Sequence, residues 1–245
     1  MTDALPDLDL SCTALFLDVD GTMLDIAAVP HEVHVPPGLG DELVALLELC
    51  GGALAVISGR TIEDIDRLFH PHRFPAAGAH GAQLRARADG TIDHISRPIP
   101  EALRANFTAL ANTPGAFIED KGVTLALHYR LAQHPVFGEA RISALEREAE
   151  ESGFTILHGK KVLELKPLGV DKGVAIRAFM AKPPFAGRQP VFAGDDRTDA
   201  HGFAVLEEFG GGGIAVGARF ADAKYCAERP GDLRAWLKSL LDNSR

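Results

Sequence analysis

The two ends of the chain share one pattern, in which short apolar runs alternate with longer stretches of helical spacing. The apolar runs lie at residues 13–17, 53–57, 191–193 and 213–216, and each predicts a buried strand. Between and after them, apolar side chains recur every three or four residues, as at Leu39, Leu43 and Leu46. Strands that alternate with helices predict an α/β fold with a doubly wound, Rossmann-like parallel sheet.

The middle of the chain follows a different pattern, which predicts two helices and two hairpins. Between residues 123 and 130, apolar side chains alternate with polar or small ones, as is typical of a strand with one buried face. We therefore expect an inserted α+β domain at residues 98–166, with helices on its apolar face and a polar face turned outward. Residues 1–97 and 167–245 would form the core domain.

Three predicted helix starts carry capping signals. Thr61 with Asp64 forms a capping-box pattern, and Asp171 and Asp232 are good N-cap residues. Lys172 follows the Asp171 cap, where a cation opposes the helix dipole. An anion would resolve this conflict. We therefore interpret Lys172 as a phosphate ligand that also steadies a nucleophile, rather than as an ordinary solvated lysine.

Acidic residues crowd the ends of two predicted strands. The first strand runs into Asp18 and Asp20, and the strand at 191–193 runs into Asp195, Asp196 and Asp199. Ligands of open parallel sheets bind at the carboxyl ends of the strands, so we expect these carboxylates to meet. So many charges need a counter-ion. Because oxygen ligands without His or Cys suit a hard cation, all five are candidate ligands of Mg²⁺.

A second anion site is predicted where the strand at 53–57 ends. Ser58 and Gly59 lie between this strand and the helix that follows Thr61, so a hydroxyl and backbone amides are placed to receive a phosphate. The tripeptide Ser58-Gly59-Arg60 is weak evidence alone, because a plain strand-to-helix turn explains it equally well.

Charge and composition exclude several classes of partner. The chain of 245 residues has a net charge of -9 and no run of Lys or Arg, which argues against nucleic acid and anionic membranes. Its first eleven residues are acidic and include Pro6, unlike a secretory signal, and no apolar run has transmembrane length. The three widely spaced cysteines predict reduced thiols. We expect a cytoplasmic monomer.

Four segments resemble the ordered motifs of the haloacid dehalogenase superfamily of phosphatases. They are Asp18-Val19-Asp20-Gly21-Thr22, Ser58-Gly59-Arg60, Lys172-Gly173 and Gly194-Asp195-Asp196-Arg197-Thr198-Asp199. The resemblance implies that Asp18 attacks phosphorus to form an aspartyl phosphate, while Asp20 protonates the departing oxygen and then activates water. It also implies Mg²⁺, with Asp195 completing the first set of ligands and Asp196 and Asp199 bound directly or through water. The continuation Ala200-His201-Gly202 is less acidic than the usual family pattern, which puts the outer surroundings of the metal in doubt.

The predicted inserted domain resembles the cap of trehalose-6-phosphate phosphatases. The matching segments begin at Glu119, Leu125 and Gly159, and Gly78-Ala79-His80-Gly81 fits the same family. In that family the cap binds the sugar pair, so the resemblance implies sugar-binding roles for six residues: Glu119, Lys121, His128, Arg130, Lys160 and Glu164. The alternation of side chains between the two faces of a strand agrees in part with these roles, since His128 and Arg130 would share the polar face. The implied activity is hydrolysis of trehalose 6-phosphate, with a functional link to a trehalose-6-phosphate synthase.

Other functions stay open at this point. Phosphatases acting on sucrose phosphate or a glycosyl phosphoglycerate, and a phosphomutase, would use the same core residues. A non-catalytic sugar-phosphate sensor is the rival from another class. The pair Asp18 and Asp20 argues against a sensor, because a protein that only binds needs no nucleophile beside an acid.

Overall fold

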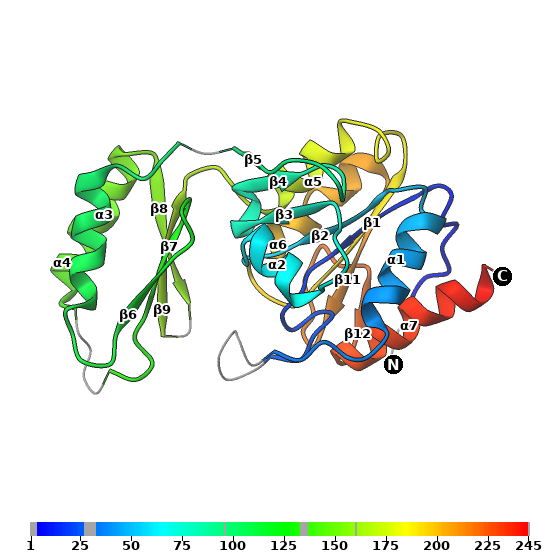
Figure 1. Cartoon of the computed structure of the whole chain (residues 1–245), viewed down its shortest axis with the longest axis horizontal. Coiled ribbons are helices and arrows are strands. Elements are labelled where there is room, and N and C mark those ends of the chain that lie inside the picture. The colour runs from blue at the N-terminus through cyan, green and yellow to red at the C-terminus, as the bar shows by residue number, and fades with distance from the viewer. Residues whose placement is uncertain (1–3, 27–32, 96, 133–136, 160, 245) are drawn as a thin grey trace. The chain divides into compact units, whose positions relative to one another are not determined.

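Two compact units make up the chain, Met1–Asp93 with Asp171–Arg245 and the inserted His94–Val170 (Figure 1). The computed structural model describes residues 4–26, 33–95, 97–132, 137–159 and 161–244. Within these residues no helix combines the length and the apolar character that crossing a membrane requires.

The larger unit is organised by an eight-stranded sheet with the order β12-β11-β10-β1-β2-β3-β4-β5. Its strands are β1 Thr13–Leu17, β2 Leu54–Ile57, β3 Ala76–Gly78, β4 Gln83–Arg85, β5 Asp93–His94, β10 Gln189–Gly194, β11 Gly212–Val216 and β12 Tyr225–Ala227. Pairing is parallel from β12 through β3, whereas β4 is antiparallel to β3. The predicted α/β class with a parallel sheet is confirmed.

The carboxyl ends of two strands meet at the centre of this sheet. β1 lies between β10 and β2, and the register pairs Leu17 with Ala193. The chain therefore leaves both strands at the same edge, directly before Asp18 and Asp195. This register brings together segments that are far apart in the sequence.

Capping signals predict the start of two among the described helices of the larger unit. The described helices are α1 Leu39–Leu49, α2 Ile62–Leu68, α5 Lys172–Met180, α6 Ala200–Phe203 and α7 Pro230–Asn243, with short 3-10 turns η2 Ala79–Gly81 and η4 Leu206–Phe209. Thr61 caps α2 by accepting the Asp64 N–H, and Asp171 caps α5 by accepting the Val174 N–H. The prediction for Asp232 is wrong. α7 begins at Pro230, whose fixed φ suits a first helical position, so Asp232 lies inside the first turn.

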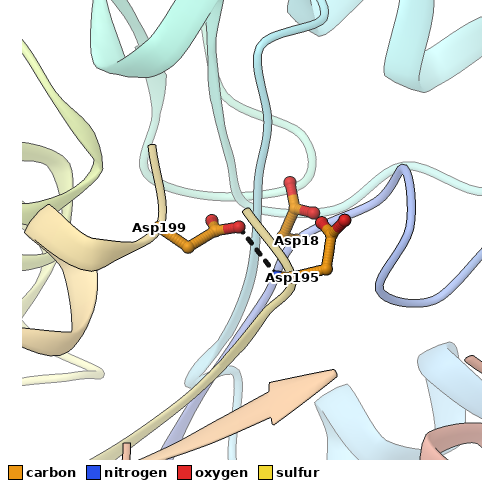
Figure 2. Close-up of side chains that lie close together, drawn as sticks. All are labelled: Asp18, Asp195 and Asp199. Carbon is orange, nitrogen blue, oxygen red and sulfur yellow. Dashed lines mark hydrogen bonds between the residues drawn. The ribbon is translucent and has the colours of Figure 1, made fainter. Parts of the chain in front are cut away.

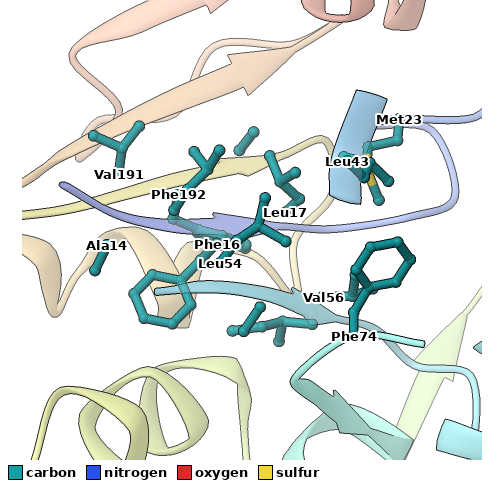
Figure 3. Close-up of a cluster of buried hydrophobic side chains, with 14 of the residues drawn as sticks. Ala14, Phe16, Leu17, Met23, Leu43, Leu54, Val56, Phe74, Val191 and Phe192 are labelled. Atoms are coloured by element: carbon teal, nitrogen blue, oxygen red, sulfur yellow. The ribbon is translucent and has the colours of Figure 1, made fainter. Parts of the chain in front are cut away.

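The core of the larger unit holds the strands rigid. All residues of β1 and β2 are buried, and Figure 3 shows Phe16, Leu54 and Val56 within the apolar cluster. Phe16 stacks on Phe185 with ring centroids 5.5 Å apart. Burying one such side chain contributes about 1.5–3 kcal/mol. The strand ends that carry the acidic residues are therefore fixed by a packed core.

The smaller unit is an antiparallel sheet with helices packed on one face (Figure 1). Its strands, in the order β6-β7-β9-β8, are β6 Phe117–Asp120, β7 Leu125–His128, β9 Val162–Pro167 and β8 Phe154–Gly159. Its helices are α3 Glu101–Thr108 and α4 Glu139–Glu151, with the 3-10 turn η3 Ala109–Ala111. Leu125, Leu127 and Leu163 pack with Phe107 and Leu145 of the two helices. The opposite face carries the polar side chains.

One expectation about this sheet is wrong. The alternation over residues 123–130 predicts one strand with Arg130 on its polar face, but β7 ends at His128. The Ala132 N–H donates to the Tyr129 carbonyl oxygen at 3.2 Å, so the chain turns there and carries Arg130 out of the ladder.

Candidate active site

Three carboxylates lie together at the central edge of the larger sheet. Asp18 follows β1, Asp195 follows β10, and Asp199 precedes α6. Carboxylate oxygens of the three lie within 4.8 Å of one another (Figure 2). The backbone N–H of Asp18 donates to the Ala193 carbonyl oxygen at 3.0 Å, which ties the two strand ends together. The meeting of acidic residues expected from the sequence takes place at these three positions.

Asp18 is buried and held by two side chains. The Lys172 Nζ donates to its Oδ1 at 2.7 Å, and the Thr22 hydroxyl donates to its Oδ2 at 2.8 Å. The same hydroxyl lies 3.2 Å from the Asp195 Oδ1. Thr22 was not singled out from the sequence, although it ends the segment that begins at Asp18. These contacts fix the direction in which the Asp18 carboxylate points.

Asp199 organises the loop that carries Asp195. Its Oδ2 accepts the backbone N–H groups of Asp195 at 2.9 Å and Asp196 at 3.0 Å, and its Oδ1 contacts the Lys172 ammonium. Gly194 is required here, since a Cβ would lie 2.4 Å from the Asp199 carboxyl carbon. Asp199 therefore accepts three donors, whereas Asp18 accepts two.

The electrostatics of this group favour a bound cation. Burial is the main cause that raises the pKa of Asp18 and of Asp195 to about 6, and it raises the pKa of Asp199 to about 7 together with the Asp18 charge. Burial alone would lower the pKa of Lys172, but the charges of Asp18 and Asp199 outweigh it and raise that pKa. One ammonium cannot balance three carboxylates. Oxygen-only ligands in this arrangement fit a hard divalent cation.

Two of the five predicted metal ligands lie outside this close group in the described part of the chain. Asp20 accepts two hydrogen bonds from the Arg60 guanidinium, Nε to Oδ2 and Nη2 to Oδ1, each at 2.6 Å. Asp196 accepts the Thr198 N–H and hydroxyl, each at 2.7 Å. Burial would raise the pKa of Asp196, but the Lys172 charge and the Thr198 bonds lower it.

The predicted phosphate loop follows β2, the neighbour of β1. Ser58 is buried, and its Oγ accepts the Arg60 N–H at 3.1 Å. The His80 ring packs against Gly59, where a Cβ would lie 2.6 Å from the ring. Ser58 and Gly59 thus lie at the same sheet edge as Asp18. Arg60 ends the motif Ser58-Gly59-Arg60, and the motif predicts no separate role for it.

The polar face of the smaller sheet gathers four of the six predicted sugar-binding residues. His128 Nε2 lies 2.8 Å from Glu119 Oε2, and Lys121 Nζ lies 3.4 Å from Glu164 Oε1. The register places the small Ala126 between Glu119 and Glu164. The hydrogen bond from His128 is the main cause that lowers the pKa of Glu119.

The remaining residues of the smaller unit differ from the prediction or add to it. Arg130 lies in the turn after β7, and Lys160 lies outside the described residues. Phe117, which the sequence did not single out, is 56% exposed and stacks on His128 with centroids 4.8 Å apart. An exposed aromatic ring beside paired charges on one sheet face suits the binding of an uncharged polar molecule.

Comparisons with known proteins show the family to which the chain belongs. Residues 16–227 match the family model of the trehalose-phosphatases. The chain is 40% identical over 230 residues to the trehalose-6-phosphate phosphatase of Escherichia coli (strain K12), which covers 93% of this chain and 86% of that one. It is 41% identical over 211 residues to a probable trehalose-phosphate phosphatase of Sinorhizobium fredii (strain NBRC 101917 / NGR234), covering 85% and 79%. A crystal structure of a trehalose-6-phosphate phosphatase related protein aligns with a TM-score of 0.75 at 26% identity, covering 94% and 97%.

Proposed function

This chain belongs to the trehalose-phosphatase family and is a phosphoric monoester hydrolase, and we propose that it hydrolyses trehalose 6-phosphate to trehalose and phosphate. The observation that carries the proposal is the buried Asp18, held by Lys172 and Thr22 beside Asp195 at the end of the central strand. A carboxylate fixed in this way among cation ligands is suited to attack a phosphorus atom.

The proposed reaction has two displacements at phosphorus. In the first, an oxygen of Asp18 bonds to phosphorus while the bond from phosphorus to the sugar oxygen breaks, and the sugar leaves as an alcohol after taking a proton from Asp20. In the second, water bonds to phosphorus, its proton passes to Asp20, and the bond to Asp18 breaks. Covalent catalysis of this kind replaces one difficult displacement by two easier ones.

Magnesium is the cation that we propose for the carboxylate group. A carboxylate offers about four lone-pair sites. Asp199 already accepts three donors, so we assign Asp18 and Asp195 as the direct ligands and Asp199 as the residue that orients Asp195. When bound, the cation would offset the repulsion between the Asp18 carboxylate and an anionic phosphate. Direct binding by the side chains of Asp20 and Asp196 stays a prediction.

We assign phosphate binding to Ser58, Gly59 and Lys172. All three belong to the larger unit, and Ser58 and Lys172 are buried. The sugar is assigned to the polar face of the smaller sheet, through Glu119, Lys121, His128 and Glu164, with Arg130 and Lys160 as further predicted contacts. Charged side chains of this kind make strong hydrogen bonds to hydroxyl groups. A monomeric state and a functional link to a synthase stay predictions.

A substrate panel tests the proposal. Purified protein with Mg²⁺ is assayed for phosphate release from trehalose 6-phosphate, sucrose 6-phosphate, a glycosyl phosphoglycerate and glucose 6-phosphate. We expect kcat/KM for trehalose 6-phosphate to exceed the others by at least about a hundredfold, which corresponds to roughly 2.7 kcal/mol. A higher kcat/KM for one of the other sugar phosphates would change the assigned substrate but leave the phosphatase activity in place. Phosphate release from none of them would contradict the function.

A further inference from the structure

The side chains of Asp20 and Arg60 form an ion pair with two parallel hydrogen bonds, which we call the Arg60 clamp. The guanidinium of Arg60 donates to both oxygens of Asp20 at 2.6 Å, one bond from Nε and one from Nη2. Arg60 is 14% exposed and Asp20 36% exposed, so the pair is partly shielded from water. Two parallel bonds of this type fix the plane of a carboxylate as well as its position.

The backbone of Arg60 is itself fixed from two sides. Its N–H donates to the Ser58 Oγ at 3.1 Å, and its carbonyl oxygen accepts the Ala79 N–H at 2.7 Å. Ala79 and His80 have φ of 48° and 56°, in the left-handed region that non-glycine residues avoid. Such a backbone costs about 1–3 kcal/mol per residue and persists only where its surroundings hold it. The guanidinium therefore extends from a well-anchored point beside the phosphate loop.

We propose that Arg60 is a positioning residue that holds Asp20 for proton transfer, an inference that rests on the roles proposed above for Asp18 and Asp20. When protonated Asp20 gives its proton to the oxygen that leaves phosphorus, it becomes a carboxylate, and the Arg60 clamp receives that carboxylate. In the second displacement the held carboxylate takes a proton from the attacking water as the bond between phosphorus and Asp18 breaks. Asp20 ends protonated again and can donate this proton in the next turnover.

Aryl phosphates test this role without involving the sugar. In the presence of Mg²⁺, Arg60→Ala is expected to lower kcat for phenyl phosphate by about ten- to a hundredfold while changing KM less than about threefold. The loss should be smaller for p-nitrophenyl phosphate, because its leaving group needs less protonation. Arg60→Lys should recover part of kcat, since a lysine keeps the charge but cannot hold both oxygens.

A double-mutant cycle separates action through Asp20 from direct contact with phosphate. Arg60→Ala is compared in the wild type and in Asp20→Asn, with p-nitrophenyl phosphate so that turnover of Asp20→Asn stays measurable. We expect a change of less than about twofold in the Asp20→Asn background, because Arg60 then has no carboxylate to hold. Arg177→Ala is the matched control, since Arg177 makes a similar double contact with Glu208 on the exposed surface and should keep wild-type kinetics.

Several results would overturn the proposal. Equal losses in both backgrounds, or a higher KM with unchanged kcat, would mean that Arg60 binds the phosphate itself. Equal losses on both aryl phosphates, with a lower Tm and no recovery in Arg60→Lys, would mean a structural role. Failure of the trehalose assignment leaves these assays unaffected, because aryl phosphates contain no sugar. If the wild type hydrolysed neither aryl nor sugar phosphates, the proposed function would be wrong, and the role of Arg60 that rests on it would be wrong as well.

Discussion

The carboxylate group of the larger unit and the polar face of the smaller unit are built in contrasting ways. The first is buried, and it joins Asp18 to Asp195 and Asp199 through the register of β1 and β10. The second lies on neighbouring antiparallel strands, where Glu119 pairs with His128 and Glu164 with Lys121 at partly exposed positions. One site depends on long-range strand order, and the other on a local sheet.

Under the proposed function, this contrast corresponds to a division between phosphoryl chemistry and recognition of the sugar. Burial strengthens electrostatic interactions, so the carboxylate group is suited to the phosphoryl chemistry that all phosphate esters share. The charges on the sheet face are more exposed than the carboxylate group, most of all in the pair of Glu119 and His128, and we assign them to recognition of the sugar. Changes in the larger unit should therefore affect every substrate, whereas changes on the polar face should affect only the sugar phosphate.

The largest effect is expected for Asp18→Asn. The amide keeps the shape of the side chain but cannot attack phosphorus, so turnover of both trehalose 6-phosphate and p-nitrophenyl phosphate should fall by at least about 10⁴-fold, or roughly 5.5 kcal/mol. The fold should survive, because burying a neutral amide costs less than burying a charge and Lys172 keeps Asp199 as its ion-pair partner. Steady-state kinetics and thermal unfolding check both parts, with the exposed Asp25→Asn as control. Retention of more than a tenth of wild-type activity would contradict the covalent mechanism.

Lys172→Met is expected to have the next largest effect. Losing the ammonium that faces Asp18 and Asp199 should lower kcat/KM for both substrates by about a hundred- to a thousandfold, equivalent to about 2.7–4 kcal/mol. It should also lower Tm, because breaking a buried ion pair costs about 3–5 kcal/mol.

The Tm loss should be smaller at pH 5 than at pH 8, because Asp199, whose pKa burial raises to about 7, takes up a proton more readily there. Lys224→Met is the matched control, since Lys224 donates to the Gly211 carbonyl oxygen at 2.7 Å and lies outside the carboxylate group of Asp18, Asp195 and Asp199. A Tm loss that is equal in the two lysine variants would argue against this role of Lys172.

Magnesium should stabilise the protein in a way that depends on pH. Burial raises the pKa of Asp18 and Asp195 to about 6 in the folded protein, above the ordinary value of about 3.9. Between about pH 4 and pH 6 the metal-free folded state therefore holds protons that the unfolded chain lacks, and its stability falls as the pH rises through this window. Protons compete with Mg²⁺ for the same carboxylates, so the affinity for Mg²⁺ increases as the pH rises over the same range.

Thermal unfolding with and without Mg²⁺ measures this dependence. At a concentration of about 100 times its Kd the metal contributes about 2.7 kcal/mol, which should raise Tm by about 5 °C or more at pH 8. The rise should be less than about 2 °C at pH 5, and Asp195→Asn should lose it at both pH values. An equal rise at both pH values in the wild type would place the metal elsewhere.

The two regions also differ in how much of them the sequence predicts. Asp18 and Asp195 follow apolar runs directly, and parallel strands must bring such positions to one edge, so their meeting could be predicted. The separation of Asp20 could not, because its partner Arg60 depends on the path of a loop that apolar periodicity does not describe. In the smaller unit, the alternation of side chains along the strand predicts the face of His128. It fails at Arg130, where a turn ends the strand two residues earlier.

The division between phosphoryl chemistry and recognition of the sugar is tested most directly by Glu164→Ala assayed on two substrates with one enzyme preparation. Binding energy from the sugar is used to position the substrate, so kcat/KM for trehalose 6-phosphate should fall by about ten- to a thousandfold, or about 1.4–4 kcal/mol. For p-nitrophenyl phosphate, which has no sugar, it should change less than about twofold. Glu148→Ala is the control, because Glu148 lies on α4 and binds the Asn106 amide, and it should leave both values unchanged. Parallel losses on both substrates in Glu164→Ala would contradict the account, since Glu164 would then support folding of the smaller unit instead of recognising the sugar.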